Sequence, residues 1–144
     1  MGVFSNKKER VAALEKVAIF GGLPKTDLGV IAQHTDEATV ENGTLLATQG
    51  RAPKHMALLV NGSAKVRRNK RTIATLGPGD TIGELSLIDG GQQTADVVCD
   101  GPCDVLLVPA QEFRVLVDDS PAFARKLMKS MAQRLREADE HLAP

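Results

Sequence analysis

The order of apolar and polar residues divides the chain into a helical beginning, a middle of short strands and a helical end. From Lys7 to Ile19 apolar residues recur at helical spacing, which predicts an amphipathic helix that stops near Gly21. A short second helix is predicted after Pro24. After His34, runs of β-branched and aliphatic residues are separated by turn signals at intervals of roughly 8–12 residues, the pattern of a small antiparallel barrel or sandwich.

The turn signals in the middle of the chain bound a series of predicted strands. These strands are residues 36–41, 44–48, 55–60, 63–68, 71–76, 94–99 and 103–108. Asn61-Gly62 between two apolar runs is the strongest hairpin signal of the set. The basic segment Lys65–Arg71 predicts a solvated hairpin rather than a nucleic-acid patch, because Asn69 lies at its centre and no aromatic side chain accompanies it.

The last third returns to helical spacing. A short helix is predicted over residues 110–117, and Ser120-Pro121 then predicts a cap and a first helical residue for a long final helix. One apolar stripe along that helix comprises Phe123, Leu127, Met131, Leu135, Ala138 and Leu142. Its second half extends past what a small barrel can cover. It predicts a homodimer or a lid over a ligand, and a plain terminal helix is the alternative.

Composition narrows the function classes. The 144 residues give room for one domain, and 18 basic against 18 acidic residues remove any broad attraction to nucleic acid or to a membrane surface. No apolar run approaches the ~20 residues of a membrane helix and no leader is recognisable, so a cytoplasmic protein is expected. Cys99 and Cys103 have no histidine nearby, and the histidines are isolated, so we expect no metal site, no catalytic constellation, no cofactor and no enzyme activity.

The most informative segment is residues 82–96, which we call the cassette segment. Gly83-Glu84-Leu85 after a glycine-rich turn can start a short helix whose free backbone N–H groups face an anion, while the glutamate can accept from a sugar hydroxyl. An ordinary turn in a barrel is the competing interpretation.

The cassette segment resembles the phosphate-binding cassette of the cyclic-nucleotide-binding domain family, found in catabolite-activator-type regulators and in regulatory subunits of cAMP-dependent protein kinase. There it reads roughly Phe-Gly-Glu-Leu-Ala-Leu, a variable run, then Pro-Arg-Ala/Thr-Ala. Further similar positions are Ile19-Phe20 with Leu23, Gly43, Gln49-Gly50, 58–62 and 76–80. The resemblance implies one domain over 1–144 that is mainly β with flanking helices. A double-stranded β-helix (jelly-roll-like) barrel at about 35–108 would follow helices at about 7–33 and precede two C-terminal helices at about 110–142.

The resemblance also implies roles for single residues. The backbone N–H groups of Leu85 and Ser86 would face the phosphate, and Glu84 would accept from the ribose 2′-hydroxyl. The ligand set implied is Gly83, Glu84, Leu85, Ser86, Gln93, Thr94 and Ala95. Gln93 stands where the family has the arginine that grips the phosphate. A neutral amide in place of a charged fork should cost about 1.5–3 kcal/mol, or ~10- to 100-fold in affinity.

The charges around the cassette segment do not replace that arginine. No Lys or Arg occurs between Arg71 and Arg114. An anionic ligand could still be held by backbone dipoles, or by a basic residue from Arg51, from Lys54 or from the final helix, which the sequence does not decide. Family members that favour cGMP often carry threonine at the position of Thr94, and others with Ser or Thr there take cAMP, so cAMP and cGMP are both candidate ligands. A plain strand start is the other interpretation of Thr94.

The resulting hypothesis is a stand-alone cyclic-nucleotide (cAMP-type) sensor or regulatory module with a weakened phosphate clamp. The alternative is a ligand-free domain of the same fold that acts in protein interaction or dimerisation. An effector protein, not identified by the sequence, is the expected partner in either case. Family transcription factors continue into a helix-turn-helix where this sequence ends at Pro144, so no direct DNA binding is expected.

Overall fold

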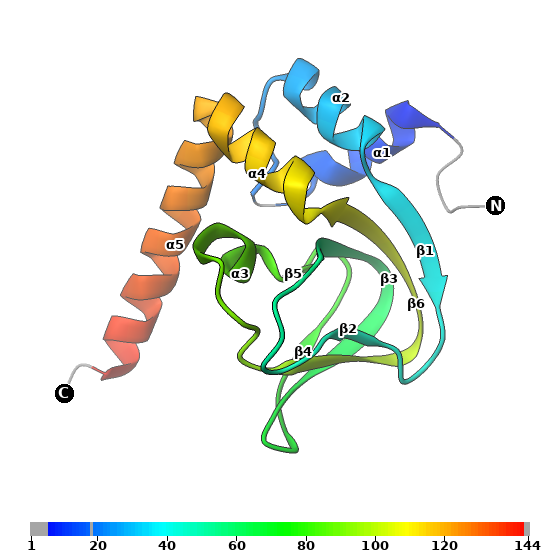
Figure 1. Ribbon diagram of the computed structural model, residues 1–144, viewed down its shortest axis with the longest axis vertical. Helices are drawn as coiled ribbons and strands as arrows, with labels where there is room; N and C mark the ends of the chain where they lie inside the picture. Colours follow the sequence, from blue (N-terminus) through cyan, green and yellow to red (C-terminus); the bar gives the residue numbers. More distant parts are fainter. Residues whose placement is uncertain (1–5, 18, 143–144) are drawn as a thin grey trace.

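The computed structural model describes residues 6–17 and 19–142, and side chains up to residue 140 (Figure 1). Two helices open the chain, α1 (Lys7–Glu15) and α2 (Lys25–Gln33). The middle consists of β1 (Asp36–Val40), β2 (Leu45–Ala47), β3 (His55–Arg68), β4 (Arg71–Leu76), β5 (Thr81–Ile82), α3 (Glu84–Asp89) and β6 (Asp96–Pro109). The chain then continues through α4 (Ala110–Asp119) and α5 (Pro121–Leu142).

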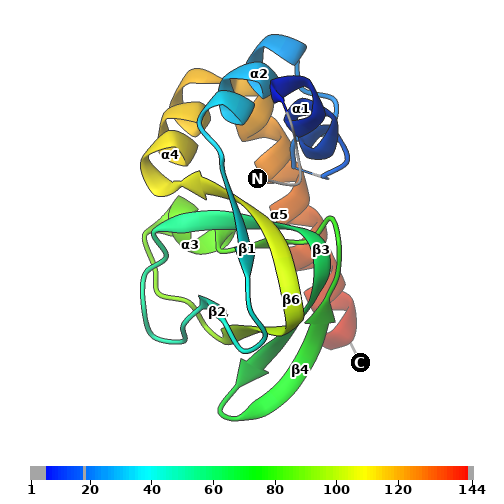
Figure 2. The same ribbon diagram turned by 90° about the vertical axis from the view of Figure 1, so that its right-hand side faces the viewer.

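All strand pairs are antiparallel, and the two longest strands organise the sheet. The strand order is β1-β6-β3-β4, with β2 added to β6 and β5 added to β3. The strands curl around an interior, while α1, α2 and α4 gather at one end of it (Figure 2). Helix α5 runs down one side, beside α3 (Figure 1). The predicted mainly β architecture with flanking helices is confirmed.

Alternation along β3 and β6 separates two apolar cores. Met56, Leu58 and Leu106 pack with the helices, whereas their neighbours Ala57 and Leu59 face the barrel interior. The helical core is anchored by three fully buried phenylalanines. The Phe123 ring stacks on Phe20 with centroids 5.4 Å apart and meets Phe113 edge-on at 5.6 Å. This cluster fixes the base of α5 on the rest of the domain.

The hairpin predicted at Asn61-Gly62 is wrong. β3 continues through these residues and β6 continues through Gly101-Pro102, so four predicted strands merge into two. The pairing register shifts around Asn61, which marks a bulge rather than a turn. Gly62 has φ +97°, and a Cβ there would lie 2.6 Å from the carbonyl oxygen of Pro102. The glycine therefore serves a close approach of two strands that bend together.

The first helix also differs from its prediction. α1 ends at Glu15, so Ile19 and Phe20 reach the core from the turn that follows, and residue 18 lies outside the described residues. Gly21 donates its N–H to the Val17 carbonyl at 2.8 Å and closes this turn. Tertiary packing of the apolar residues therefore overrides the helical spacing.

Other local predictions hold. Residues 65–71 form the exposed β3–β4 hairpin, with Asn69 and Lys70 at positive φ in its turn. Ser120 Oγ accepts from the Phe123 N–H at 3.2 Å and caps α5, which begins at Pro121 as predicted. Within the described residues, no helix is long and apolar enough to span a bilayer.

Candidate functional site

The cassette segment begins with a tight turn from β5 into α3. Gly83, the residue before α3, has φ +93°. A Cβ at this position would lie 3.0 Å from Gln93 Nε2 and 3.1 Å from the carbonyl oxygen of His55. Position 83 therefore needs glycine both for its backbone angle and for its space. The expected short helix over this segment is confirmed.

Glu84 is the buried acidic residue of the cassette. Its exposed fraction is 5%, although it is the first residue of a short surface helix. The carboxylate is held by a long-range ion pair, in which Arg134 Nη2 of α5 donates to Glu84 Oε1 at 2.8 Å. This pair satisfies the buried charge and joins the cassette to the last helix.

Gln93 is partly buried and lies against Gly83 and Ser86. Ser86 Oγ donates to Gln93 Oε1 at 3.4 Å. The other end of the amide, Nε2, is buried and has no hydrogen-bond partner among the described residues. A buried N–H donor without an acceptor is costly, so an acceptor brought by a ligand would be favourable at this position.

The remaining predicted site residues differ in exposure and in contacts. Arg68 of β3 donates to the Thr94 carbonyl at 3.1 Å and to Thr94 Oγ1 at 3.3 Å. Ala95 is buried, and the Leu85 side chain is 44% exposed. The suggestion that Thr94 starts a strand is wrong, because β6 begins at Asp96.

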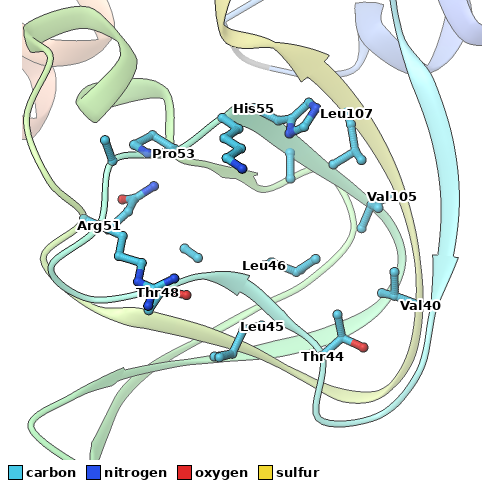
Figure 3. A pocket seen from close by; sticks show the side chains of 15 residues that line it. Val40, Thr44, Leu45, Leu46, Thr48, Arg51, Pro53, His55, Val105 and Leu107 are labelled. Carbon is cyan, nitrogen blue, oxygen red and sulfur yellow. The ribbon is translucent and has the colours of Figure 1, made fainter.

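A cavity of about 350 Å³ opens into the barrel interior next to the cassette segment. Figure 3 shows Arg51 at one edge of this cavity and Val40 and Val105 on its opposite side. Gln93 and Lys54 also line it. The structure thus brings two of the basic residues considered from sequence to the same cavity as Gln93. The third source, the final helix, supplies Arg134 to Glu84 instead.

Two arginine contacts were missed by the sequence reasoning. Arg68 is the last residue of β3, and its contact with Thr94 joins positions far apart in sequence. For Arg134, the sequence indicates only that the final helix can supply a cation, because the contact with Glu84 depends on the angle at which α5 leaves α4.

The cysteines lie away from this site. Cys99 and Cys103 are free thiols buried in the barrel interior. Burial raises the pKa of Cys99 to about 12, and the hydrogen bond and charge of Cys103 add to the effect. Among residues 6–17 and 19–142, no group of three His, Cys, Asp or Glu side chains could hold a metal ion.

Comparison with known sequences decides the family. A sequence model described as "Cyclic nucleotide-binding domain" matches residues 37–120, more than half of the chain. The chain belongs to the cyclic nucleotide-binding domain family. The match covers the whole cassette segment and most of the barrel.

Individual relatives agree with the family assignment. The chain is 29% identical over 129 residues to the cyclic AMP receptor protein of Thermus thermophilus, covering 86% of this chain but 60% of that protein. Two solved structures share the fold. They are the regulatory domain of Toxoplasma gondii PKA with cAMP (21% identity, TM-score 0.77, 88% of this chain and 50% of that one) and the sensor domain of the transcriptional regulator DNR from Pseudomonas aeruginosa (15% identity, TM-score 0.80, 96% of both chains).

Proposed function

We propose that this domain is a non-enzymatic sensor that binds a cyclic nucleotide of the cAMP type and reports binding through α5. The observation that carries the proposal is the position of Glu84. Its carboxylate is buried at the start of α3, in the cassette segment, and contacts Arg134 of α5. A sensor of this kind must couple ligand binding to a change elsewhere in the protein. Glu84 belongs both to the proposed ligand site and to the contact with α5.

The proposed recognition uses the second carboxylate oxygen. Arg134 binds Glu84 Oε1, so Oε2 remains to accept from a ribose hydroxyl. Arg134 at the same time fixes the orientation of the carboxylate. The backbone N–H groups of Leu85 and Ser86 at the start of α3 would face the phosphate, as the family resemblance implies.

The proposed output is a shift of α5. A ligand that draws on the Glu84 carboxylate changes the strength of the contact with Arg134, and through it the preferred position of α5. The size of such a shift is limited by the difference in ligand affinity between the two positions. Since Phe123 holds the base of α5 in the helical core, its distal part is the part that can respond.

Affinity should be modest, because position 93 carries an amide. We expect a dissociation constant in the micromolar range or weaker, following the loss of a charged contact. The base preference stays between adenine and guanine: Thr94 Oγ1 accepts from Arg68 yet keeps capacity for a guanine amino group. Both cAMP and cGMP therefore belong in the titration.

The test compares two variants of the cassette by calorimetric titration with cAMP. Glu84→Ala removes the proposed ribose acceptor and should weaken binding about tenfold or more. Ser86→Ala is the matched control, since it removes a neighbouring hydroxyl but keeps the backbone N–H. Urea unfolding checks that both variants fold. Equal affinities for wild type and Glu84→Ala would remove the ribose role.

A second candidate function is protein interaction without a ligand. The observation that favours it is the apolar surface of α5, where Met128 is 59% and Leu135 is 71% exposed. In that case Arg134 and Glu84 would hold α5 in a permanent position. Absence of heat with both cAMP and cGMP, together with a dimer in sedimentation, would favour this candidate.

A further inference from the structure

The cavity beside Gln93 combines an apolar floor with basic lining residues. Its floor is apolar and includes Leu46, Ala57 and Val105. Its basic lining residues are Arg51, Lys54 and His55, and no Asp or Glu among the described residues lines it. The cavity therefore suits a ligand with an anionic group and a less polar body. This contrasts with the cassette segment itself, which is rich in acidic residues.

Backbone hydrogen bonds fix the β2–β3 loop, residues 48–54, against Gln93. The Gly50 N–H donates to the Gln93 carbonyl, and the Gln93 N–H donates to the Arg51 carbonyl, both at 2.9 Å. On the other side, Gly83 lies so close to Gln93 and His55 that a Cβ would be within 3.1 Å of both. The basic loop thus lies beside Gly83 and Gln93, although it is far from both in sequence.

The two basic side chains beside Gln93 are available to bind an anion. Arg51 and Lys54 are exposed, and neither forms an ion pair with a described residue. Two other arginines that contact the cassette segment already have partners there, Arg68 in Thr94 and Arg134 in Glu84. An anion between Arg51, Lys54 and Gln93 would also give the buried Nε2 its missing acceptor.

We propose that Arg51 and Lys54 form a relocated clamp that holds the phosphate of the cyclic nucleotide in place of an arginine at position 93. The inference rests on the proposed function and adds to it the residues that carry the anion. Arginine can donate to two phosphate oxygens at once, and lysine provides a point charge on a flexible side chain. A loop that carries both can therefore bind a phosphate at the cavity mouth.

The test separates the phosphate contribution from the rest of the ligand. Wild type and Arg51→Gln/Lys54→Gln are titrated with cAMP and with adenosine, which lacks the phosphate. The clamp predicts that the double variant binds cAMP about tenfold more weakly or worse, with a smaller salt dependence, while adenosine binds both proteins alike. The matched control is Lys8→Gln/Lys25→Gln. It removes the same charge from exposed positions on α1 and α2, at the other end of the molecule (Figure 2).

A second variant keeps the test decisive. Adding Gln93→Arg to the double variant returns the cation to position 93 and should recover the lost cAMP affinity. Unchanged cAMP affinity in Arg51→Gln/Lys54→Gln overturns the clamp while leaving the proposed function intact. An equal loss in the control pair also overturns it, because the effect would then be one of net charge. No binding of cAMP or cGMP by wild type overturns the proposed function, and the clamp with it.

Discussion

Arg134 Nη2 lies 2.8 Å from Glu84 Oε1, and this contact ties the final helix to the first residue of the short helix α3. The glutamate side chain is 7% exposed and that of the arginine 45%, so the carboxylate depends on the pair far more than the guanidinium does. Removing the arginine leaves a buried charge, whereas removing the glutamate leaves a cation that water can solvate.

Arg134→Ala should therefore lower the free energy of unfolding by about 1–2 kcal/mol, a value reduced from that of a fully buried pair because Arg134 is half exposed. Urea unfolding measures it. Arg136→Ala is the control, since Arg136 is exposed on the same helix and should change stability by less than about 0.5 kcal/mol. Similar losses in the two variants would show that the ion pair stabilises nothing.

The exposed stripe of α5 predicts self-association. Leu135 is 71% exposed and Ala138 is exposed, as expected for residues past the reach of the barrel, while the Leu142 side chain lies outside the described residues. Leu135→Glu should convert a dimer into a monomer in analytical ultracentrifugation, and truncation after Gln133 should also leave a folded monomer. Gln133→Glu adds the same charge at another exposed position of α5 and should leave the dimer intact. A wild type that stays monomeric at high micromolar concentration would exclude this interface.

Substitution of Gly62 tests whether the close approach of β3 and β6 requires a glycine. Gly62→Ala must meet both a positive φ and a Cβ 2.6 Å from the Pro102 carbonyl oxygen, so we expect a loss of more than about 2 kcal/mol. Gly43→Ala shares the positive φ but meets nothing within 4 Å, and should cost about 1 kcal/mol. Equal losses in urea unfolding would mean that backbone strain, not strand approach, sets the requirement.

Cys99 gives a pH-dependent prediction. Its pKa is raised in the folded protein from 9.0 to about 12, chiefly by burial, so the folded state keeps a proton that the unfolded state loses. The stability that this provides is complete below about pH 9 and is lost as pH rises toward 12, with a slope of at most about 1.4 kcal/mol per pH unit. Between pH 8 and pH 10, stability should fall less in Cys99→Ala than in wild type. Parallel pH profiles would contradict the burial effect.

Local patterns were enough for most of the elements but not for their continuity. The spacing of Phe123 and Leu127 and the Ser120-Pro121 cap are properties of neighbours in sequence, so α5 could be predicted to the residue at its start. Asn61-Gly62 was read as a turn because a turn and a bulge use the same residues. Only the partner strand at Pro102 distinguishes them, and that partner lies far away in sequence.

In the site, too, the residues could be predicted from the sequence but their distant partners could not. Gly83, Glu84 and Gln93 could be found because the cassette segment is contiguous. The partners of these residues could not, since Arg134 arrives from a helix whose direction depends on the phenylalanine cluster. In the sequence, Arg51 and Lys54 are only two of several basic residues. Their position beside Gln93 follows from the backbone hydrogen bonds between the β2–β3 loop and Gln93.

Under the proposed function, this domain binds a cyclic nucleotide although its phosphate clamp lacks the family arginine. Calorimetric titration of wild type and Gln93→Arg with cAMP tests it most directly. We expect micromolar or weaker binding by wild type and a tightening of ~10- to 100-fold in Gln93→Arg, with greater salt dependence, because the guanidinium adds a charged fork to the contacts proposed for Arg51 and Lys54. If both proteins fold and neither binds cAMP or cGMP, the pocket does not accept the ligand and the sensor account is wrong.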